Sequence, residues 1–142
     1  MAFNVLVVDD SAVMRAMIVR TLQMTGVPLG EIHQAGNGQE ALEVLKDQWV
    51  DLALVDINMP VMNGEELIER VRENPLIRDL SVIVVSTESS ETRIERILNQ
   101  GAEFVHKPFT AESLRETILQ VTGVSDDQRA SVGAPPGDDF DF

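Results

Sequence analysis

The chain is predicted to form an α/β domain in which helices cover both faces of a doubly wound, five-stranded parallel sheet. Five short apolar runs alternate with five segments of helical periodicity, a pattern typical of parallel strands joined by right-handed crossovers. A length of 142 residues suits one domain. Polar residues follow four of the runs. Because the carboxyl ends of parallel strands share one edge, where ligands bind, these residues predict a functional site.

The first part of the chain contains two predicted strand and helix pairs. Phe3–Val8 is a buried strand, Ser11 caps the helix after it, and Gly26 ends that helix. Residues 31–35 are more polar, which favours an edge strand. The apolar positions of the two helices are Val13, Met14, Met17, Ile18 and Leu22 in the first, and Ala41, Leu42 and Leu45 in the second.

The middle of the chain contains the most apolar run, Leu52–Val55, which predicts a central strand. A loop at Asn58–Gly64 follows, and the next helix ends at Asn74 and Pro75. The apolar positions of this helix are Leu67, Ile68 and Val71.

Two further pairs complete the predicted domain. A β-branched strand at Val82–Val85 precedes a helix that ends at Gly101. A short strand at Phe104–His106 precedes a helix capped by Thr110. The apolar positions of these helices are Ile94, Ile97 and Leu98, and then Leu114, Ile118 and Val121.

The composition changes at Gly123. Residues 123–142 include five Asp and one Arg and have almost no aliphatic periodicity. We therefore expect a folded domain over residues 1–122 and an acidic, disordered tail over residues 123–142.

Charge and composition narrow the class of protein. The chain has 24 acidic and 11 basic residues, a net charge of −13, so it should repel nucleic acids and anionic membrane surfaces. It has no cysteine, and its first residues lack the pattern of a secretory leader. No apolar run approaches the ~18 residues of a membrane span. We expect a cytoplasmic protein that binds neither nucleic acid nor membrane.

The residues that follow the strands suggest metal-assisted phosphoryl chemistry. Asp9, Asp10 and Asp56 supply carboxylates for a divalent cation, and Lys107 and Ser86 can neutralise phosphoryl oxygens. Each residue also has a simpler reading. The aspartates can serve as a helix-terminal charge pair and a turn cap, the lysine as a surface charge and the serine as an ordinary strand-end hydroxyl. Thr87 competes with Ser86 for the hydroxyl role.

Four stretches carry a family resemblance, and they span roughly residues 3–121. They read LVVDDSAVMR, ALVDINMPVMNGEEL, VIVVSTES and HKPFTAESL. Together they resemble the receiver domain of two-component response regulators, specifically the stand-alone chemotaxis type. The resemblance implies a flavodoxin-like fold.

The resemblance also implies roles for the site residues. Asp56 would be the phosphoacceptor, and Lys107 would contact the phosphoryl group. Asp10, Asp56 and the backbone carbonyl of Asn58 would hold Mg²⁺, with Asp9 acting through water. The phosphoryl donor would be a histidine kinase. Phosphotransfer and dephosphorylation would be self-catalysed, so the protein is a switch and not a conventional enzyme.

Ser86 would be the hydroxyl that moves toward the phosphoryl group, and Asn58 and Glu88 would tune the phosphoryl lifetime. The output would be a target protein bound on the face formed by the fourth helix, fifth strand and fifth helix. The aromatic switch position falls on Phe104, with His106 as the next candidate, because one residue fewer than usual precedes Lys107.

Three rival functions remain open at this point. Residues 36–41 match the dinucleotide fingerprint G-x-G-x-x-G/A, but they follow a predicted edge strand, so a turn and helix start explains them better. A metal-dependent phosphatase would need a general acid two residues after Asp56, where Asn58 stands. A receiver-like module that only binds partners would not need the intact site.

Overall fold

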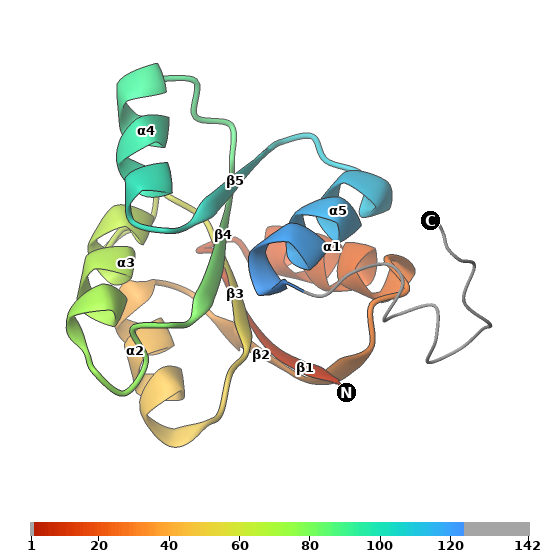
Figure 1. Cartoon of the computed structure of the whole chain (residues 1–142), viewed down its shortest axis with the longest axis horizontal. Coiled ribbons are helices and arrows are strands. Elements are labelled where there is room, and N and C mark those ends of the chain that lie inside the picture. Colours follow the sequence, from red (N-terminus) through yellow and green to blue (C-terminus); the bar gives the residue numbers. More distant parts are fainter. Residues whose placement is uncertain (1, 124–142) are drawn as a thin grey trace.

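Five strands form one sheet in the computed structural model, which describes residues 2–123. They are β1 (Phe3–Val8), β2 (Leu29–Ala35), β3 (Leu52–Val55), β4 (Ser81–Ser86) and β5 (Glu103–His106). All neighbouring pairs are parallel, and the order across the sheet is β2-β1-β3-β4-β5 (Figure 1). This confirms the predicted fold class, with β2 at an edge and β3 at the centre.

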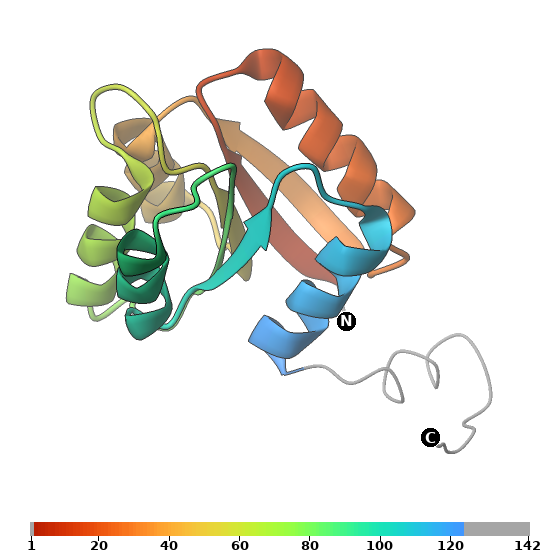
Figure 2. The same cartoon turned by 90° about the horizontal axis from the view of Figure 1, so that it is seen from above.

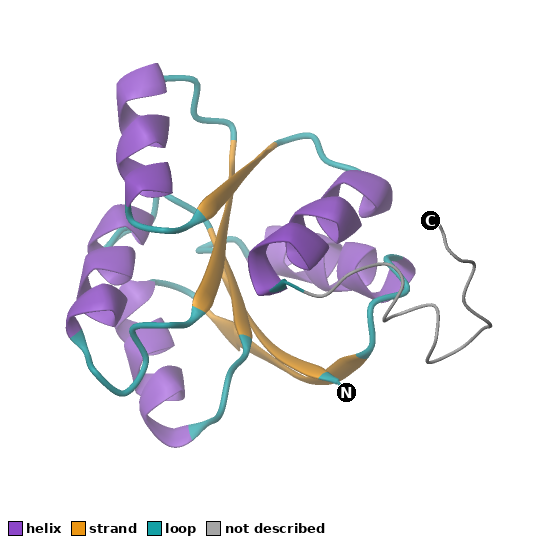
Figure 3. Cartoon of the chain, in the orientation of Figure 1, coloured by secondary structure: helices purple, strands orange, loops and turns teal. Residues whose placement is uncertain are grey.

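Each strand is followed by a loop and a helix (Figure 3). The helices are α1 (Ala12–Met24), α2 (Gly38–Asp47), α3 (Gly64–Glu73), α4 (Glu91–Asn99) and α5 (Ala111–Thr122). A side-chain oxygen caps the first turn of every one, and the caps are Ser11, Asn37, Asn63, Ser90 and Thr110. The predicted caps Ser11 and Thr110 are therefore confirmed.

The sheet separates two apolar cores because successive strand residues point to opposite faces. One core includes Leu6, Val8, Ala53, Val55, Val82 and Val84, covered by α2, α3 and α4. The other includes Val5, Val7, Leu52, Leu54, Ile83 and Val85, covered by α1 and α5. Figure 2 shows α1 and α5 together on one side of the sheet, where they also contact each other.

The apolar face of α1 is narrower than its sequence suggests. Ile18 and Leu22 are buried, whereas Val13 is 72% and Met17 54% exposed. Neighbouring residues in a helix lie about 100° apart around its axis, so Val13 and Met17 fall outside the stripe through Met14, Ile18 and Leu22. The same geometry leaves Leu98 of α4 44% exposed, although Ile97 is buried.

A half-buried arginine fixes the carboxyl end of α4. The Arg72 side chain, in α3, donates from Nε to the backbone oxygen of Gln100 at 2.7 Å. Its Nη1 donates to the backbone oxygens of Arg78 and Leu80, each at 2.7 Å. Burial lowers the pKa of this guanidinium, and the negative charge of Asp79 opposes that shift. By bonding to three carbonyl oxygens, Arg72 thus connects α3 to the loop before β4 and to the end of α4.

The order in which strands are added to the sheet changes direction at β1, because β2 lies on one side of β1 and β3 on the other. In open α/β sheets ligands bind at such a point, beyond the carboxyl ends of the strands. None of the helices within residues 2–123 is long and apolar enough to cross a membrane.

Candidate functional site at the carboxyl edge of the sheet

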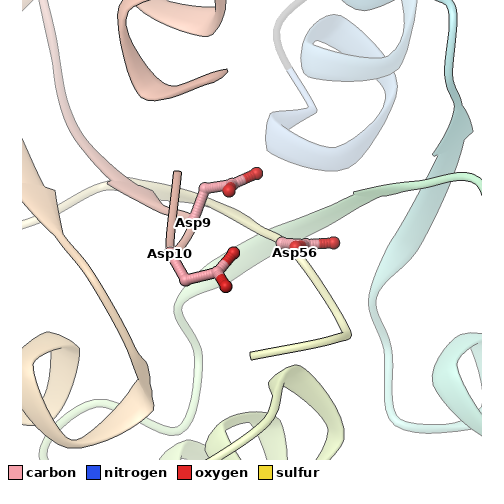
Figure 4. A group of neighbouring side chains, drawn as sticks. All are labelled: Asp9, Asp10 and Asp56. Atoms are coloured by element: carbon pink, nitrogen blue, oxygen red, sulfur yellow. The ribbon is translucent and has the colours of Figure 1, made fainter. Parts of the chain in front are cut away.

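Three carboxylates meet where β1 and β3 end. Asp9 and Asp10 follow β1, and Asp56 follows β3 (Figure 4). The backbone N–H of Asp56 donates to the carbonyl of Val8 at 2.9 Å, which extends the β1–β3 pairing to Asp56. One oxygen from each of the three carboxylates lies within 4.8 Å of the others. The fold therefore brings Asp56 to two adjacent aspartates that precede it by 46 and 47 residues in the sequence.

The most buried of the three is Asp9, which is 2% exposed. Its Oδ1 accepts a hydrogen bond from the Ser11 N–H at 2.9 Å. Among the described residues its Oδ2 has no hydrogen-bond partner, although Lys107 Nζ lies 3.6 Å away as an ion pair. A buried carboxylate oxygen with spare acceptor capacity, beside two more carboxylates, fits a hard cation such as Mg²⁺ or a water bound to one.

The lysine side chain enters the site from the end of β5. The Lys107 N–H donates to the Ser86 carbonyl at 2.9 Å, and the Lys107–Pro108 peptide bond is cis. Its Nζ lies 4.0 Å from Asp56 Oδ1 as well as 3.6 Å from Asp9. One ammonium thus faces two of the three carboxylates, and the cluster keeps a surplus of negative charge.

Burial raises the pKa of the Asp56 carboxyl above its ordinary value. The positive charge of Lys107 opposes this rise, while the charges of Asp9 and Asp10 add to it. A hydrogen bond from the Ile57 N–H also acts to lower the pKa. In the absence of a cation, the site therefore disfavours a third negative charge.

The Ser86 side chain lies at the end of β4 and is buried. Its Oγ accepts a hydrogen bond from the Glu88 N–H at 3.1 Å, so the hydroxyl is tied to the loop between β4 and α4. The competing residue, Thr87, is exposed. In this structure the loop and the hydroxyl must move together or lose their bond.

Phe104 lies on β5, half-buried, and packs against the core covered by α2, α3 and α4. Its ring meets the ring of His106 edge-on, with the centroids 4.7 Å apart. His106 is exposed, so the aromatic pair runs from the core to the surface. The role of Phe104 as the aromatic switch stays a prediction.

Arg93 joins the two positions predicted to tune the phosphoryl lifetime. Its Nη1 donates to Glu88 Oε1 at 2.8 Å and to Asn58 Oδ1 at 3.3 Å. Its Nε donates to Glu65 Oε1 at 2.6 Å. Sequence reasoning missed this arginine, because Glu65 and Asn58 lie 28 and 35 residues away from it and no spacing rule links them.

Gly64 permits the loop after Asp56 to fold back closely. A Cβ at Gly64 would lie 2.4 Å from the backbone oxygen of Asp56, and the Gly64 N–H donates to the Ile57 carbonyl at 2.9 Å. Within the same loop Val61 has a φ of 70°, which is unusual for a β-branched residue. The loop is therefore closely packed at one end and strained near its middle.

The glycines of the dinucleotide-like pattern have a structural explanation. Asn37 caps α2, and Gly38 begins it. A Cβ at Gly38 would lie 2.7 Å from Met62 Cγ and 2.9 Å from the Met62 carbonyl oxygen. The segment follows the edge strand β2 and lies in a turn and helix start, as predicted.

Comparison with known proteins identifies the family. Residues 5–119 match the model of the response regulator receiver domain, and the chain belongs to that family. Members of this family are phosphorylation-activated switches of two-component signalling. The phosphatase and binding-module alternatives receive no support.

Similar proteins include several with chemotaxis names. The chain is 36% identical to a chemotaxis protein CheY homolog of Campylobacter jejuni over 130 residues, which cover 90% of this chain and 98% of the relative. It is 35% identical to chemotaxis protein CheY1 of Helicobacter pylori, over 87% of this chain and 99% of that one. A solved structure of the chemotaxis response regulator CheY4 of Vibrio cholerae is 34% identical, and the match covers 85% of this chain and 99% of that one with a TM-score of 0.74.

Proposed function

We propose that this receiver accepts a phosphoryl group on Asp56 from the phosphohistidine of a histidine kinase and passes the signal to a partner protein. The observation that carries this proposal is the meeting of Asp56 with Asp9, Asp10 and Lys107 at one edge of the sheet. Receiver domain relatives include a stretch of the sensor kinase LuxN of Vibrio harveyi, which is 38% identical over 115 residues.

In the proposed transfer, each bond that forms is matched by a bond that breaks. An Asp56 oxygen attacks phosphorus, the P–N bond to the donor imidazole breaks, and the imidazole leaves with the bonding pair and takes up a proton. An acyl phosphate remains on Asp56. In hydrolysis, water attacks phosphorus, the bond between phosphorus and the Asp56 oxygen breaks, and the carboxylate and inorganic phosphate are released. Both steps are catalysed by the chain itself, so the protein is a switch and not a conventional enzyme.

The carboxylates of Asp10 and Asp56 and the backbone carbonyl of Asn58 would hold Mg²⁺, with Asp9 acting through a bound water. When bound, the ion supplies positive charge that neutralises phosphoryl oxygens. The buried Oδ2 of Asp9, which lacks a hydrogen bond among the described residues, supports its share in this site.

Lys107 would bind a phosphoryl oxygen through its ammonium, which already lies within 4.0 Å of Asp56 Oδ1. Ser86 would donate its hydroxyl proton to another oxygen and leave its bond with Glu88. Asn58 and Glu88 would tune the lifetime of the acyl phosphate, and Phe104 would follow the movement. The target protein would bind the face formed by α4, β5 and α5.

The relatives named as chemotaxis proteins favour a role in chemotaxis. The division into a receiver over residues 1–122 and a tail is consistent with α5 ending at Thr122. Residues 124–142 lie outside the part of the chain that the structure describes, so the disorder of the tail stays a prediction. The cytoplasmic location also stays a prediction.

Incubation with Mg²⁺ and acetyl phosphate, followed by intact-mass measurement, tests the proposal. The chain should gain the mass of one phosphoryl group, and the gain should disappear in Asp56→Asn and when the cation is chelated. A stable Asp56→Asn protein that gains the same labile group at the wild-type rate would show that another residue is the acceptor.

A further inference from the structure

Arg93 connects three segments that lie beside the site. It binds Glu65 in the first turn of α3, Glu88 in the loop between β4 and α4, and Asn58 in the loop after β3. We call these four residues the Arg93 clamp. Because Arg93 lies in the first turn of α4, the clamp fixes the amino end of that helix against α3.

The clamp is more than a loose surface contact. The side chains of Arg93, Glu65 and Glu88 are only 23%, 21% and 19% exposed. Burial would raise the pKa of Glu65, but hydrogen bonds from Arg93 and Arg96 outweigh it and the pKa falls. The pKa of Arg93 rises, chiefly through its bond to Glu65. A half-buried guanidinium with several acceptors is held more firmly than an isolated surface ion pair.

The clamp is continuous with the hydroxyl at the end of β4. Glu88 donates its N–H to Ser86 Oγ at 3.1 Å and accepts from the Ser90 N–H at 3.0 Å. Ser90 in turn caps α4 by accepting from the Arg93 N–H at 3.3 Å. The position of Ser86 is thus connected through Glu88 and Arg93 to α3.

We propose that Arg93 is a positioning residue that holds the β4–α4 loop and the first turn of α4 in place while Asp56 is unmodified. The inference rests on the proposed function and extends it. Ser86 cannot turn toward a phosphoryl group and keep its bond to Glu88 unless the loop follows. Arg93 resists that movement, because it ties Glu88 to Glu65 and Asn58. It therefore sets the free-energy cost of switching.

Arg96 provides a matched control, one turn further along α4. Within residues 2–123 its guanidinium hydrogen-bonds to Glu65 alone, with Nε 3.1 Å from Oε2. Its side chain is 56% exposed. Arg93→Met and Arg96→Met each remove one arginine from the same face, but only the first releases Glu88 and Asn58.

Fluoroberyllate with Mg²⁺, which mimics a phosphoryl group on a carboxylate, can be titrated against each variant and followed by amide chemical shifts. Arg93→Met should bind it about five- to tenfold more tightly than wild type, because less free energy is spent on releasing the loop. Arg96→Met should stay within about twofold. In the free Arg93→Met protein, the amide signals of Ser86–Ser90 should already lie partway toward their bound positions.

A second variant covers the case in which Arg93→Met does not fold. Glu65→Gln removes the anchor on α3, so it should also tighten binding, and its effect should not add to that of Arg93→Met. Unchanged or weaker binding in Arg93→Met, or equal effects of the two arginine variants, would overturn the inference while leaving the proposed function intact. No binding to wild type, with Asp56 signals unmoved, would overturn both.

Discussion

Replacing Asp56 by Asn should stabilise the protein when no divalent cation is present. The substitution removes the charge of a mostly buried carboxylate and keeps its shape. The amide oxygen can still accept the hydrogen bond from the Ile57 N–H that the carboxylate accepts. The variant should also lose most of the stabilisation that Mg²⁺ gives the wild type, since it contributes a weaker ligand.

The size of the effect follows from the distances. At 4.8 Å or less, and with an effective dielectric constant near 20, Asp56 repels each of the other two carboxylates by roughly 3.5 kcal/mol. The ammonium of Lys107 at 4.0 Å offsets about 4 kcal/mol of this. The remaining repulsion is about 3 kcal/mol. Asp10 is exposed and its charge is screened by solvent, so we expect a net gain of about 1–2 kcal/mol.

Thermal unfolding in EDTA and in Mg²⁺ measures this prediction. A gain of 1–2 kcal/mol corresponds to a rise in melting temperature of about 4–8 °C for a domain of this size. The pKa of Asp56 is raised in the folded state, so its stabilising contribution is complete below the unfolded pKa and is lost as the pH rises through the folded one. The advantage of Asp56→Asn in EDTA should therefore grow from pH 4 to neutral pH.

Glu43→Gln is the matched control, because it removes the same charge from an exposed position in the middle of α2. It should change the melting temperature little and leave the Mg²⁺ response intact. A lower melting temperature for Asp56→Asn in EDTA at neutral pH would refute the repulsion argument. A wild-type Mg²⁺ response in Asp56→Asn would exclude Asp56 as a ligand.

Three further outcomes are expected. Lys107→Ala should still be phosphorylated by acetyl phosphate but show a reduced shift of the Ser86 amide signals, and a complete shift would contradict the phosphoryl contact. Because the substitution removes the cation beside buried Asp9, it should also lower the free energy of unfolding in EDTA by about 1–3 kcal/mol. Gly64→Ala should destabilise by about 1–3 kcal/mol, measured by denaturant unfolding, because its Cβ meets backbone that no rotamer change can move; a neutral result would mean that the loop adapts. Truncation after Gly123 should leave the melting temperature unchanged within about 2 °C if the tail is outside the folded domain, and a larger drop would move the domain boundary.

The strand and helix pattern carried the fold prediction because parallel sheets have a simple rule: both faces are apolar and every strand is followed by a crossover. The same rule located the site. Asp9, Asp10 and Asp56 come directly after apolar runs, and the end of a run marks the carboxyl edge whatever the tertiary details. Ser11 and Thr110 were predictable as caps because capping depends on a few neighbouring residues.

Contacts between distant segments were beyond the same reasoning. Nothing near Arg93 or Arg72 indicates which of the many acceptors in the chain each arginine would reach, because the choice depends on how α3 and α4 pack. Helical spacing likewise placed Val13 and Met17 among the apolar positions of α1, but it did not show which side of that helix faces the sheet. Neighbouring residues were enough to predict the helices, strands and caps. The hydrogen-bond partners of the two arginines are known only once the helices are packed together.

The two ends of α4 are held by different kinds of bond. Arg72 grips the carboxyl end through a neutral backbone carbonyl, whereas the amino end depends on the carboxylates of Glu65 and Glu88. Added salt screens attraction between partly exposed opposite charges, and it has much less effect on a hydrogen bond to a neutral carbonyl. At high ionic strength, the amino end of α4 should therefore loosen first, and amide hydrogen exchange should accelerate there first. The carboxyl end should stay bound at Gln100, so the helix would rotate about that end.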